Sequence, residues 1–277
     1  MAFSLDKVFT TVTAFPPAKL GVTEIPPTEV LKPFIRCFWQ CNGSGLRGVR
    51  VIPDCCADII IPTDGNKSIF VGVSDGSFCT LGTGVAFGIR FYAWALKPFI
   101  NARISDTFNT ALPASEVFKG FSELQNRIAE CPDIYSKAAC AERYLIEILK
   151  GELSADIMNS IYYVVARDGG ATVKDVSDYI AVGKRTLERR FVECAGVSPK
   201  AMLGLIRYQM LWQSCVKGGF SAPDSAFRLG YYDEAHMYND FKRYHGIGIS
   251  EARAEYAALS HFYNTSERSG GIIVKKA

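Results

Sequence analysis

Two stretches of the sequence decide the fold: VGKRTLERRFVECAGVSP at 182–199 and MYNDFKRYHGIGI at 237–249. Both contain an apolar residue, a second apolar residue four positions later, then a glycine and a third apolar residue. The matched pairs are Leu187 with Met237, Phe191 with Phe241, Gly196 with Gly246, and Val197 with Ile247. A spacing of four puts the first two on one face of a helix, and the glycine is typical of a helix C-terminus. The chain is therefore predicted to contain the same helical unit twice.

Each unit is preceded by a shorter predicted helix. The first spans 172–180 with Thr172 as its N-cap, and the second spans 223–229 with Pro223 as its first residue and Gly230 after its end. A short helix, a tight turn and a second helix that ends in glycine is the helix-turn-helix pattern. Between the units, 199–216 predicts one continuous helix of about 27 Å, a suitable spacer for two reading helices one DNA turn, about 34 Å, apart.

Charged and polar residues lie opposite the apolar face of each reading helix. An exposed arginine that binds guanine through two hydrogen bonds contributes about 1–3 kcal/mol of base discrimination. The alternative is that these charges merely solvate a helix surface. The candidate DNA contacts are Lys184, Arg185, Glu188, Arg189 and Arg190 in the first unit, and Ala235, His236 and Asn239, with Lys242 and Arg243 for phosphates, in the second.

With these motifs in place, residues 154–257 resemble the AraC/XylS family of bacterial transcription regulators. The resemblance lies in KRTLERRF followed by AGVSP, and in LGYYDEAHMYNDFKRYHGI. It implies two helix-turn-helix modules joined by a long helix, with both reading helices in successive major grooves. By position, it implies DNA contacts from Arg185, Glu188 and Arg189 in the first module and from Ala235, His236 and Asn239 in the second.

The sequence departs from the family pattern at several positions. Ala181 stands where the family favours glycine, Gly183 where a capping serine is usual, and Asn239 where an arginine is common. Gly248 and Ile249 replace the usual Ser-Pro pair. Because asparagine carries no charge for phosphate or guanine, we expect the first module to dominate the affinity for DNA.

The N-terminal part has a different pattern. Up to about residue 110, short apolar runs alternate with turn signals, which predicts strands at 34–41, 47–52, 58–62, 69–73, 78–81 and 85–92. Helical spacing then begins with Phe121, Leu124 and Ile128 and continues over 134–149, a helix for either a core or a dimer surface. We expect a two-domain α+β protein: a β-sandwich or barrel with helices at 1–150, an all-α double helix-turn-helix domain at 154–262 and a tail at 263–277.

A set of polar and aromatic residues in the β-rich domain is the candidate effector pocket. Its members are Arg36, Trp39, Asp54, Asp58, Arg90, Phe91 and Trp94. A buried Asp–Arg pair that holds the sheets together, with the tryptophans in the core, is the alternative. The stretches FIRCFWQ, VIPDCCADIII and GIRFYAW resemble β-rich sensor domains of some AraC/XylS regulators, which implies ligand sensing or dimerisation.

Composition and missing motifs exclude several classes of protein. Hydrophobic residues make up 48% and charged residues 21%, which is globular, and no apolar run reaches the roughly 20 residues of a membrane span, so a cytoplasmic protein is expected. The nine cysteines are an odd number, and the adjacent pair Cys55 and Cys56 suits zinc poorly beside Cys37 and Cys41, so free thiols and no metal are expected. The sequence has no phosphate-binding loop and no histidine before His236, so no cofactor and no enzymatic activity are expected.

The main hypothesis is a sequence-specific DNA-binding transcription regulator, an activator or a repressor, controlled by a signal at the N-terminal domain. Its expected partners are double-stranded DNA, a small-molecule effector, RNA polymerase and a second copy of the chain. The net charge of only +3 and the uncharged Asn239 favour an alternative, a protein–protein interaction module that uses a degenerate helix-turn-helix fold. A third hypothesis is an N-terminal enzyme fused to a DNA-binding domain.

Overall fold

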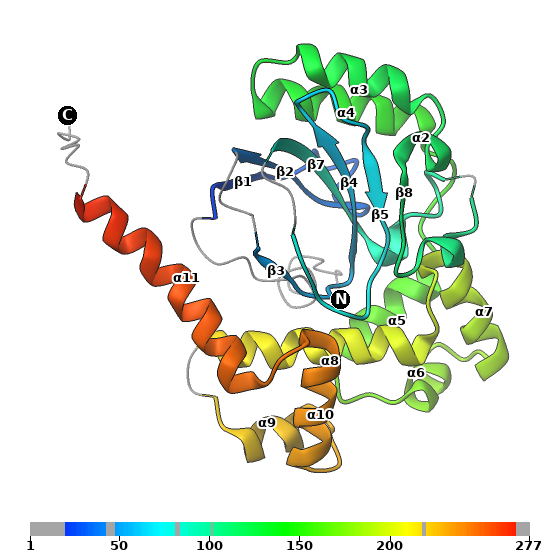
Figure 1. The fold of residues 1–277 in the computed structure, drawn as a ribbon. Helices are drawn as coiled ribbons and strands as arrows, with labels where there is room; N and C mark the ends of the chain where they lie inside the picture. The colour runs from blue at the N-terminus through cyan, green and yellow to red at the C-terminus, as the bar shows by residue number, and fades with distance from the viewer. Residues whose placement is uncertain (1–19, 43–47, 81–83, 101, 218–219, 270–277) are drawn as a thin grey trace.

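The structure is a computed structural model, and it describes residues 20–42, 48–80, 84–100, 102–217 and 220–269. A sheet with helices over one face occupies the N-terminal half, and a helical layer lies beneath it (Figure 1). This arrangement confirms the expected fold class, a β-rich region with helices followed by an all-α region. Among the described residues, no helix is long and apolar enough to cross a membrane.

The N-terminal half is built on a six-stranded antiparallel sheet. Its order is β1 (Val22–Ile25), β2 (Ile35–Asn42), β7 (Val85–Tyr92), β4 (Cys56–Pro62), β5 (Ile69–Val71) and β8 (Ala111–Pro113). A separate two-stranded sheet pairs β3 (Arg50–Val51) with β6 (Phe78–Cys79). The six predicted strands are all present, although Arg47 and Leu81, at the ends of two of them, lie outside the described residues.

Two strands and two short 3-10 helices were not predicted. Within the part of the chain that the structure describes, both strands lie at the edges of the sheet: β1 pairs only with β2, and β8 only with β5. Edge strands need only one partner and can be short, so their sequence signal is weak. The 3-10 helices are η2 (Ala93–Ala95), directly after β7, and η3 (Ile104–Thr107).

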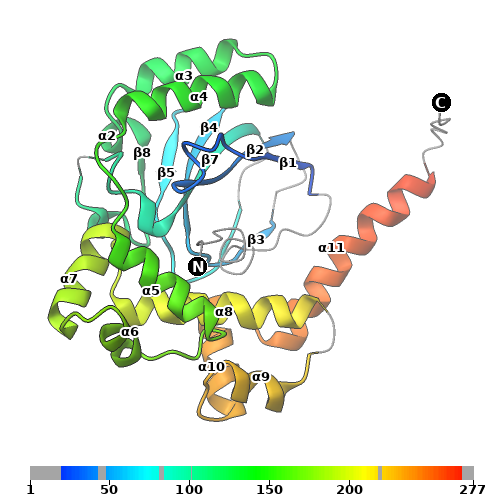
Figure 2. The ribbon, with the colours of Figure 1, turned by 180° about the vertical axis from the view of Figure 1, so that it is seen from behind.

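Three helices follow the sheet: α2 (Ala114–Val117), α3 (Phe121–Glu130) and α4 (Ile134–Ile148). The last two lie side by side over one face of the sheet (Figures 1 and 2). The predicted inner face of α4 is buried, with Ala141 and Leu145 fully enclosed. That face therefore belongs to the core of the domain, which settles the alternative left open by the sequence.

The C-terminal half is entirely helical. It consists of α5 (Ala155–Ala166), α6 (Val173–Tyr179), α7 (Lys184–Ala195), α8 (Pro199–Val216), α9 (Ala222–Arg228), α10 (Glu234–His245) and α11 (Ile249–Ser269). Figure 2 shows α5, α6 and α7 near one end of α8, with α9 and α10 nearer the other end. The segment 149–154 between α4 and α5 contains the predicted domain boundary. The last helix continues to Ser269, past the predicted end at 262, and 270–277 lie outside the described residues.

Local sequence signals position the first module. Thr172 forms a capping box with Asp175 at the start of α6, and Gly183 is the N-cap of α7, as predicted. In the turn between them, Ala181 has a φ of 54°. A left-handed φ is strained for a residue with a Cβ, which gives a physical reason why the related family favours glycine at this position.

Candidate nucleic-acid interface

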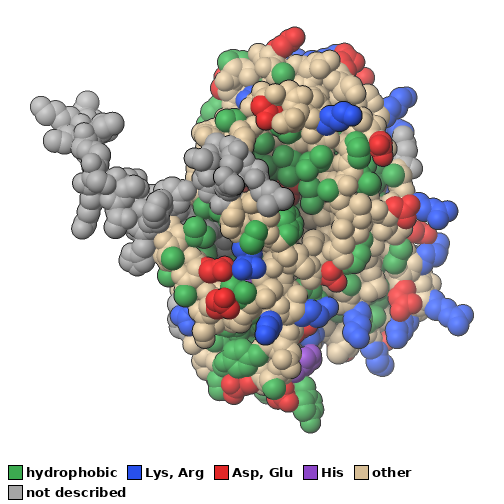
Figure 3. All heavy atoms as spheres, in the orientation of Figure 1, with side chains coloured by type: hydrophobic (Ala, Val, Ile, Leu, Met, Phe, Trp, Pro, Cys, Tyr) green, Lys and Arg blue, Asp and Glu red, His purple; other side chains and the backbone are tan. Residues whose placement is uncertain are grey.

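The first reading helix, α7, separates its apolar and charged faces cleanly. Leu187 and Phe191 are fully buried. The opposite face exposes Lys184, Arg185, Glu188 and Arg189 to solvent. In the orientation of Figure 3, Lys and Arg side chains gather on the side of the molecule where α6 and α7 lie. Four of the five candidate residues on α7 are thus accessible to a large partner.

The fifth candidate, Arg190, is held within the protein. Its Nη1 contacts Oδ2 of Asp156 on α5, and its side chain is about one-third exposed. Arg189 remains mostly exposed and reaches Glu193, one turn further along, at 3.6 Å. The sequence could not predict the Arg190–Asp156 pair, because a helical pattern does not show which partner a distant helix supplies.

The second reading helix, α10, has the same internal plan. Met237 and Phe241 are fully buried, and the side chain of Asp233 caps the helix by accepting a hydrogen bond from the backbone N–H of His236 at 2.7 Å. The candidate residues Ala235, His236, Asn239, Lys242 and Arg243 are all exposed. Arg243, however, lies 3.0 Å from Asp240 and places its guanidinium over the ring of Tyr244.

Two aromatic side chains of the second module point into solvent. Phe227 in α9 is 89% exposed, and Tyr232 in the turn before α10 is 93% exposed. Their neighbours Ala226 and Tyr231 are buried and supply the packing of the module. The packing of the module therefore does not use Phe227 or Tyr232, and both rings are accessible to a partner.

Both reading helices end against the N-terminal domain. A Cβ on Gly196, at the end of α7, would lie 2.7 Å from the carbonyl oxygen of Ile104 in η3. At the end of α10, the hydroxyl of Ser77 donates to the carbonyl of His245 at 2.6 Å, and the Ser77 N–H donates to the carbonyl of Tyr244 at 3.0 Å. The opposite ends of both helices, which carry most of the candidate DNA contacts, therefore lie away from these junctions.

Further contacts join the N-terminal domain to the helical half. Arg50 makes a two-point ion pair with Glu255 on α11, at 3.0 and 3.2 Å. The Gln209 amide, near the middle of α8, donates to the carbonyl of Pro53. Lys97 lies 3.8 Å from Glu193 on α7. The spacer helix and both reading helices are thus all anchored to the same domain.

His245 is a buried histidine at the centre of the second module. Its Nδ1 lies 2.8 Å from the hydroxyl of Tyr208, and its ring packs against Trp212 and Phe241. Burial, and secondarily the positive charge of Arg50, lower the pKa of His245 from its ordinary value of 6.5 to about 4. The imidazole is therefore neutral near pH 7 and serves packing rather than contact with DNA.

The members of the predicted effector set lie in different surroundings in the structure. Asp58 accepts hydrogen bonds from Trp39 Nε1 at 2.8 Å and from Arg90 Nε at 3.0 Å, and the Trp39 ring lies directly against Gly88. This is the Asp–Arg pair weighed as the alternative. Arg36 instead pairs with Glu24 on the neighbouring strand.

The remaining members of that set lie in the core or in a turn. Phe91 is fully buried and packs on Phe99 and Phe118. Asp54 accepts a hydrogen bond from the backbone N–H of Cys56 at 3.1 Å. Trp94 is buried and also borders a cavity at the first reading helix. An effector site made of the whole set stays a prediction.

The cysteines are all free, and seven of the nine are buried. Burial raises the pKa of Cys37 to about 12, which keeps it in the unreactive thiol form. Within the described ranges, no three His, Cys, Asp or Glu side chains gather as metal ligands.

Comparison with known families divides the chain in the same way. Residues 176–255 match a family described as a helix-turn-helix domain, and residues 23–113 match a domain of unknown function (DUF6597). No curated protein matches the sequence.

Three solved structures are similar to the chain at low identity. ToxT from Vibrio cholerae is 12% identical, with 84% of this chain and 96% of ToxT covered and a TM-score of 0.41. The C-terminal domain of AraT, a response regulator from Geobacillus stearothermophilus, is 20% identical over 38% of this chain and 88% of its own, with a TM-score of 0.36. A DNA-binding transcriptional dual regulator from Escherichia coli is 18% identical over 39% and 98%, with a TM-score of 0.35. These likenesses are too distant to assign residues or ligands.

The family matches and the geometry agree on the reading helices, because α7 and α10 both fall within 176–255. The chain therefore matches two family models in tandem, a domain of unknown function (DUF6597) over the sheet and a helix-turn-helix domain over the segment that contains α7 and α10.

Proposed function

We propose that this protein is a sequence-specific transcription regulator that reads DNA chiefly through α7. The observation that carries the proposal is the exposure of Lys184, Arg185 and Arg189 on the face opposite the buried Leu187 and Phe191. Arginines on such a face can reach base edges while the helix stays packed. The second module adds Lys242, at the C-terminal part of α10, for contact with phosphates.

We also propose that a small-molecule signal at the N-terminal domain controls DNA binding. The anchoring of both reading helices to that domain supports this, because a change in its shape would be transmitted directly to α7 and α10. A homodimer on DNA and contact with RNA polymerase at a promoter complete the proposal; both remain predictions from the sequence. The activator role is likewise a prediction.

The experiment begins by selecting bound fragments from random double-stranded DNA with the purified full chain. We expect two half-motifs about ten base pairs apart, centre to centre. The Arg185→Ala, Arg189→Ala double variant should then lose about a hundredfold in affinity for the selected sequence, since two base-reading arginines are removed. Fluorescence anisotropy on labelled DNA gives the affinities.

The matched control removes two exposed lysines of the N-terminal domain, Lys67→Ala with Lys119→Ala. It changes the net charge equally, and its affinity should stay within about twofold of the parent because neither lysine lies on a reading helix. Equal losses in the two variants would point to general charge attraction. Unchanged binding by the arginine variant would remove α7 from the interface.

A protein–protein interaction module is the second candidate, favoured by the exposed Phe227 and Tyr232. Asp233 and Glu234 lie beside Tyr232 at the start of α10, where an acidic surface would repel phosphate. A salt titration separates the two functions. DNA binding through phosphates must weaken steeply as salt rises, whereas binding without that dependence would favour the protein-interaction function.

A further inference from the structure

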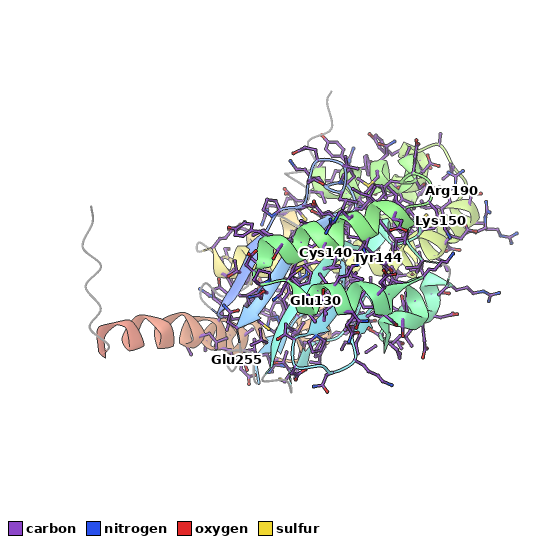
Figure 4. All side chains as sticks on the ribbon, turned by 90° about the horizontal axis from the view of Figure 1, so that it is seen from above. Glu130, Cys140, Tyr144, Lys150, Arg190 and Glu255 are labelled. Atoms are coloured by element: carbon purple, nitrogen blue, oxygen red, sulfur yellow. The ribbon has the colours of Figure 1, made fainter. Side chains whose placement is uncertain are left out.

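Two turns of the helical half meet beside α8. One comprises residues 167–170, between α5 and α6, where the first module begins, and the other comprises residues 229–231, between α9 and α10 of the second module. Other parts of the helical half are well separated: in Figure 4, Arg190 on α7 and Glu255 on α11 lie on opposite sides of the molecule. We call the two turns, together with Arg207 of α8, the module junction.

The backbones of the two turns approach each other closely because both carry glycine. A Cβ on Gly230 would lie 2.9 Å from the Cα of Gly170 and 3.1 Å from its carbonyl oxygen. Carbon atoms that are not bonded to each other prefer about 3.5–4.0 Å, and both neighbours are backbone atoms that cannot rotate away. Any larger residue at position 230 must therefore push one turn away from the other.

Each turn is held by the helix that it ends. The N–H of Gly169 donates to the carbonyl of Val164 in α5 at 2.9 Å, and the N–H of Tyr231 donates to the carbonyl of Ala226 in α9 at 2.9 Å. Gly169 has a φ of 77° and Gly230 a φ of 71°, the left-handed conformation that commonly closes a helix. The two turns therefore meet as fixed ends of helices.

Arg207 joins the two turns from the middle of α8. Its Nε donates to the carbonyl of Gly169 at 3.2 Å, and its guanidinium carbon lies 5.2 Å from the centroid of the Tyr231 ring. A hydrogen bond from a charged donor is stronger than a neutral one, and a guanidinium is attracted to the face of an aromatic ring. A single side chain thus contacts the turn before α6 and the turn before α10.

A surface ion pair also crosses the junction. Arg228, at the end of α9, lies 3.7 Å from Asp168 in the other turn, and both side chains are about half exposed. Water screens such a pair, so it contributes little. The close approach of the glycines and the two contacts of Arg207 are therefore the main connection between the turns.

Both turns are tied to a reading helix. The hydroxyl of Tyr231 donates to Asp240 of α10 at 3.4 Å. On the other side, α5 carries Asp156, which pairs with Arg190 of α7. A displacement at the junction would therefore reach α7 and α10 together.

We propose that the module junction fixes the distance and angle between α7 and α10, and that it thereby sets the spacing of half-motifs that the protein binds. The inference rests on the proposed reading of DNA, and it assigns Arg207 and Gly230 as positioning residues that act through the reading helices. One added base pair moves the second half-motif by about 3.4 Å along the DNA and about 35° around it. Two reading helices held at a fixed separation cannot follow that move.

The test uses the purified full chain and the DNA sequence selected as described above. Anisotropy gives the affinity for that sequence, for the same sequence with one base pair added or removed between the half-motifs, and for the first half-motif alone. Arg207→Met should bind the selected sequence about tenfold more weakly and lose most of the preference for its spacing. The reason is that the unlinked modules spend part of their time in arrangements that fit only one half-motif. Affinity for the first half-motif alone should stay within about twofold.

Gly230→Ala tests the junction without removing a charge, and it should also lower the preference for the selected spacing about tenfold. Its control is Gly120→Ala, because Gly120 has the same φ of 71° but a Cβ there would meet nothing within 4 Å. The control for Arg207→Met is Lys200→Met, which removes an exposed cation from the first turn of the same helix. Both controls should keep the preference of the parent.

Hydrogen exchange of the free protein, followed by mass spectrometry, tests the junction without DNA. In Arg207→Met the segments 167–170 and 229–231 should both exchange about tenfold faster, because one side chain holds both. Faster exchange in only one of the two turns would show that Arg207 does not join them, and would overturn the inference.

The DNA measurements separate this inference from the proposed function. A selected sequence whose spacing preference is unchanged in both Arg207→Met and Gly230→Ala would defeat this inference alone. An equal loss of affinity for the first half-motif alone would do the same, since it would indicate damage to α7 instead of a lost spacing. Failure to select any DNA sequence would defeat the proposed function, and the assignment of spacing with it.

Discussion

In the first module the reading helix begins with Lys184 and Arg185, whereas in the second the matched positions are Glu234 and Ala235. The difference reverses toward the other end of the helices, where Glu193 of α7 corresponds to Arg243 of α10. The buried residues match closely, and both helices close with a glycine at positive φ. Packing therefore requires the same buried residues and the same backbone conformation in both modules, while the exposed residues of each module can differ and suit different partners.

Alanine substitutions of the two glycines that end the reading helices should have the largest effect and should affect the two modules differently. Gly196→Ala should lower the free energy of unfolding by about 3 kcal/mol, from the left-handed φ and the contact with the rigid backbone carbonyl of Ile104. Gly246→Ala meets the hydroxyl of Ser77, a side chain that can rotate, so we expect about 2 kcal/mol. Chemical denaturation measures both.

Gly151→Ala is the matched control. Gly151 also has a positive φ, of 86°, but a Cβ there would meet nothing within 4 Å. Its loss, about 1 kcal/mol, therefore isolates the cost of the backbone conformation. If Gly196→Ala costs no more than Gly151→Ala, α7 is not held against η3 in solution.

The next difference between the modules is a pH dependence of the free energy of unfolding, which we expect from the second module alone. His245 is buried as a neutral group with its pKa lowered to about 4, and the matched residue of the first module is Ala195. Because the unfolded histidine has a pKa near 6.5, its contribution to stability is complete above that pH and is lost as the pH falls toward 4. From pH 7.5 to pH 5 the free energy of unfolding should drop by about 2 kcal/mol from this group.

The same pH series is measured on the His245→Gln variant. Carboxylates titrate in the parent and in the variant alike, so the difference between the two series comes from His245. The variant should be less stable at pH 7.5 but show a smaller drop on acidification, measured by urea denaturation at each pH. An equally steep drop in the variant would show that His245 is not the group responsible.

Adding positive charge to the second reading helix tests whether its exposed residues limit its contribution to DNA affinity. Glu234→Lys with Asn239→Arg makes α10 resemble α7 at matched exposed positions, so DNA affinity should rise about tenfold and its salt dependence should steepen. Anisotropy on the selected sequence measures the effect. The same charge change at distant sites, Glu116→Lys with Asn66→Arg, should raise affinity little; a fall in affinity of the α10 variant would place that surface against another partner.

The helical half was the more predictable part of the molecule. The repeat, the caps at Thr172 and Gly183 and the helix 199–216 all depend on residues within a few positions of one another, and the structure has them where the sequence placed them. Local spacing is enough for such features because helix hydrogen bonds are local.

The contacts between distant segments were less predictable. The pairing of Arg190 with Asp156, the role of Ser77 at the end of α10 and the exposure of Phe227 each depend on which segments meet in the fold. In the β-rich domain, the edge strands β1 and β8 of the six-stranded sheet were not predicted. The predicted effector set combined residues of the core with residues that contact Asp58. The sequence of a strand shows that apolar and polar side chains alternate, but it does not show which other segment packs against each face.

In the proposed complex with DNA, the hydrogen bond from Gln209 to Pro53 limits how the two helix-turn-helix modules can move. It fixes the middle of α8 to the sheet domain, while α7 and α10 meet the same domain at Gly196 and Gly246. A DNA-binding domain that is held by three contacts cannot readily change the spacing of its reading helices. An operator of a different shape must therefore deform in order to be bound. Base steps that bend easily between the two half-motifs would then favour binding although no side chain touches them.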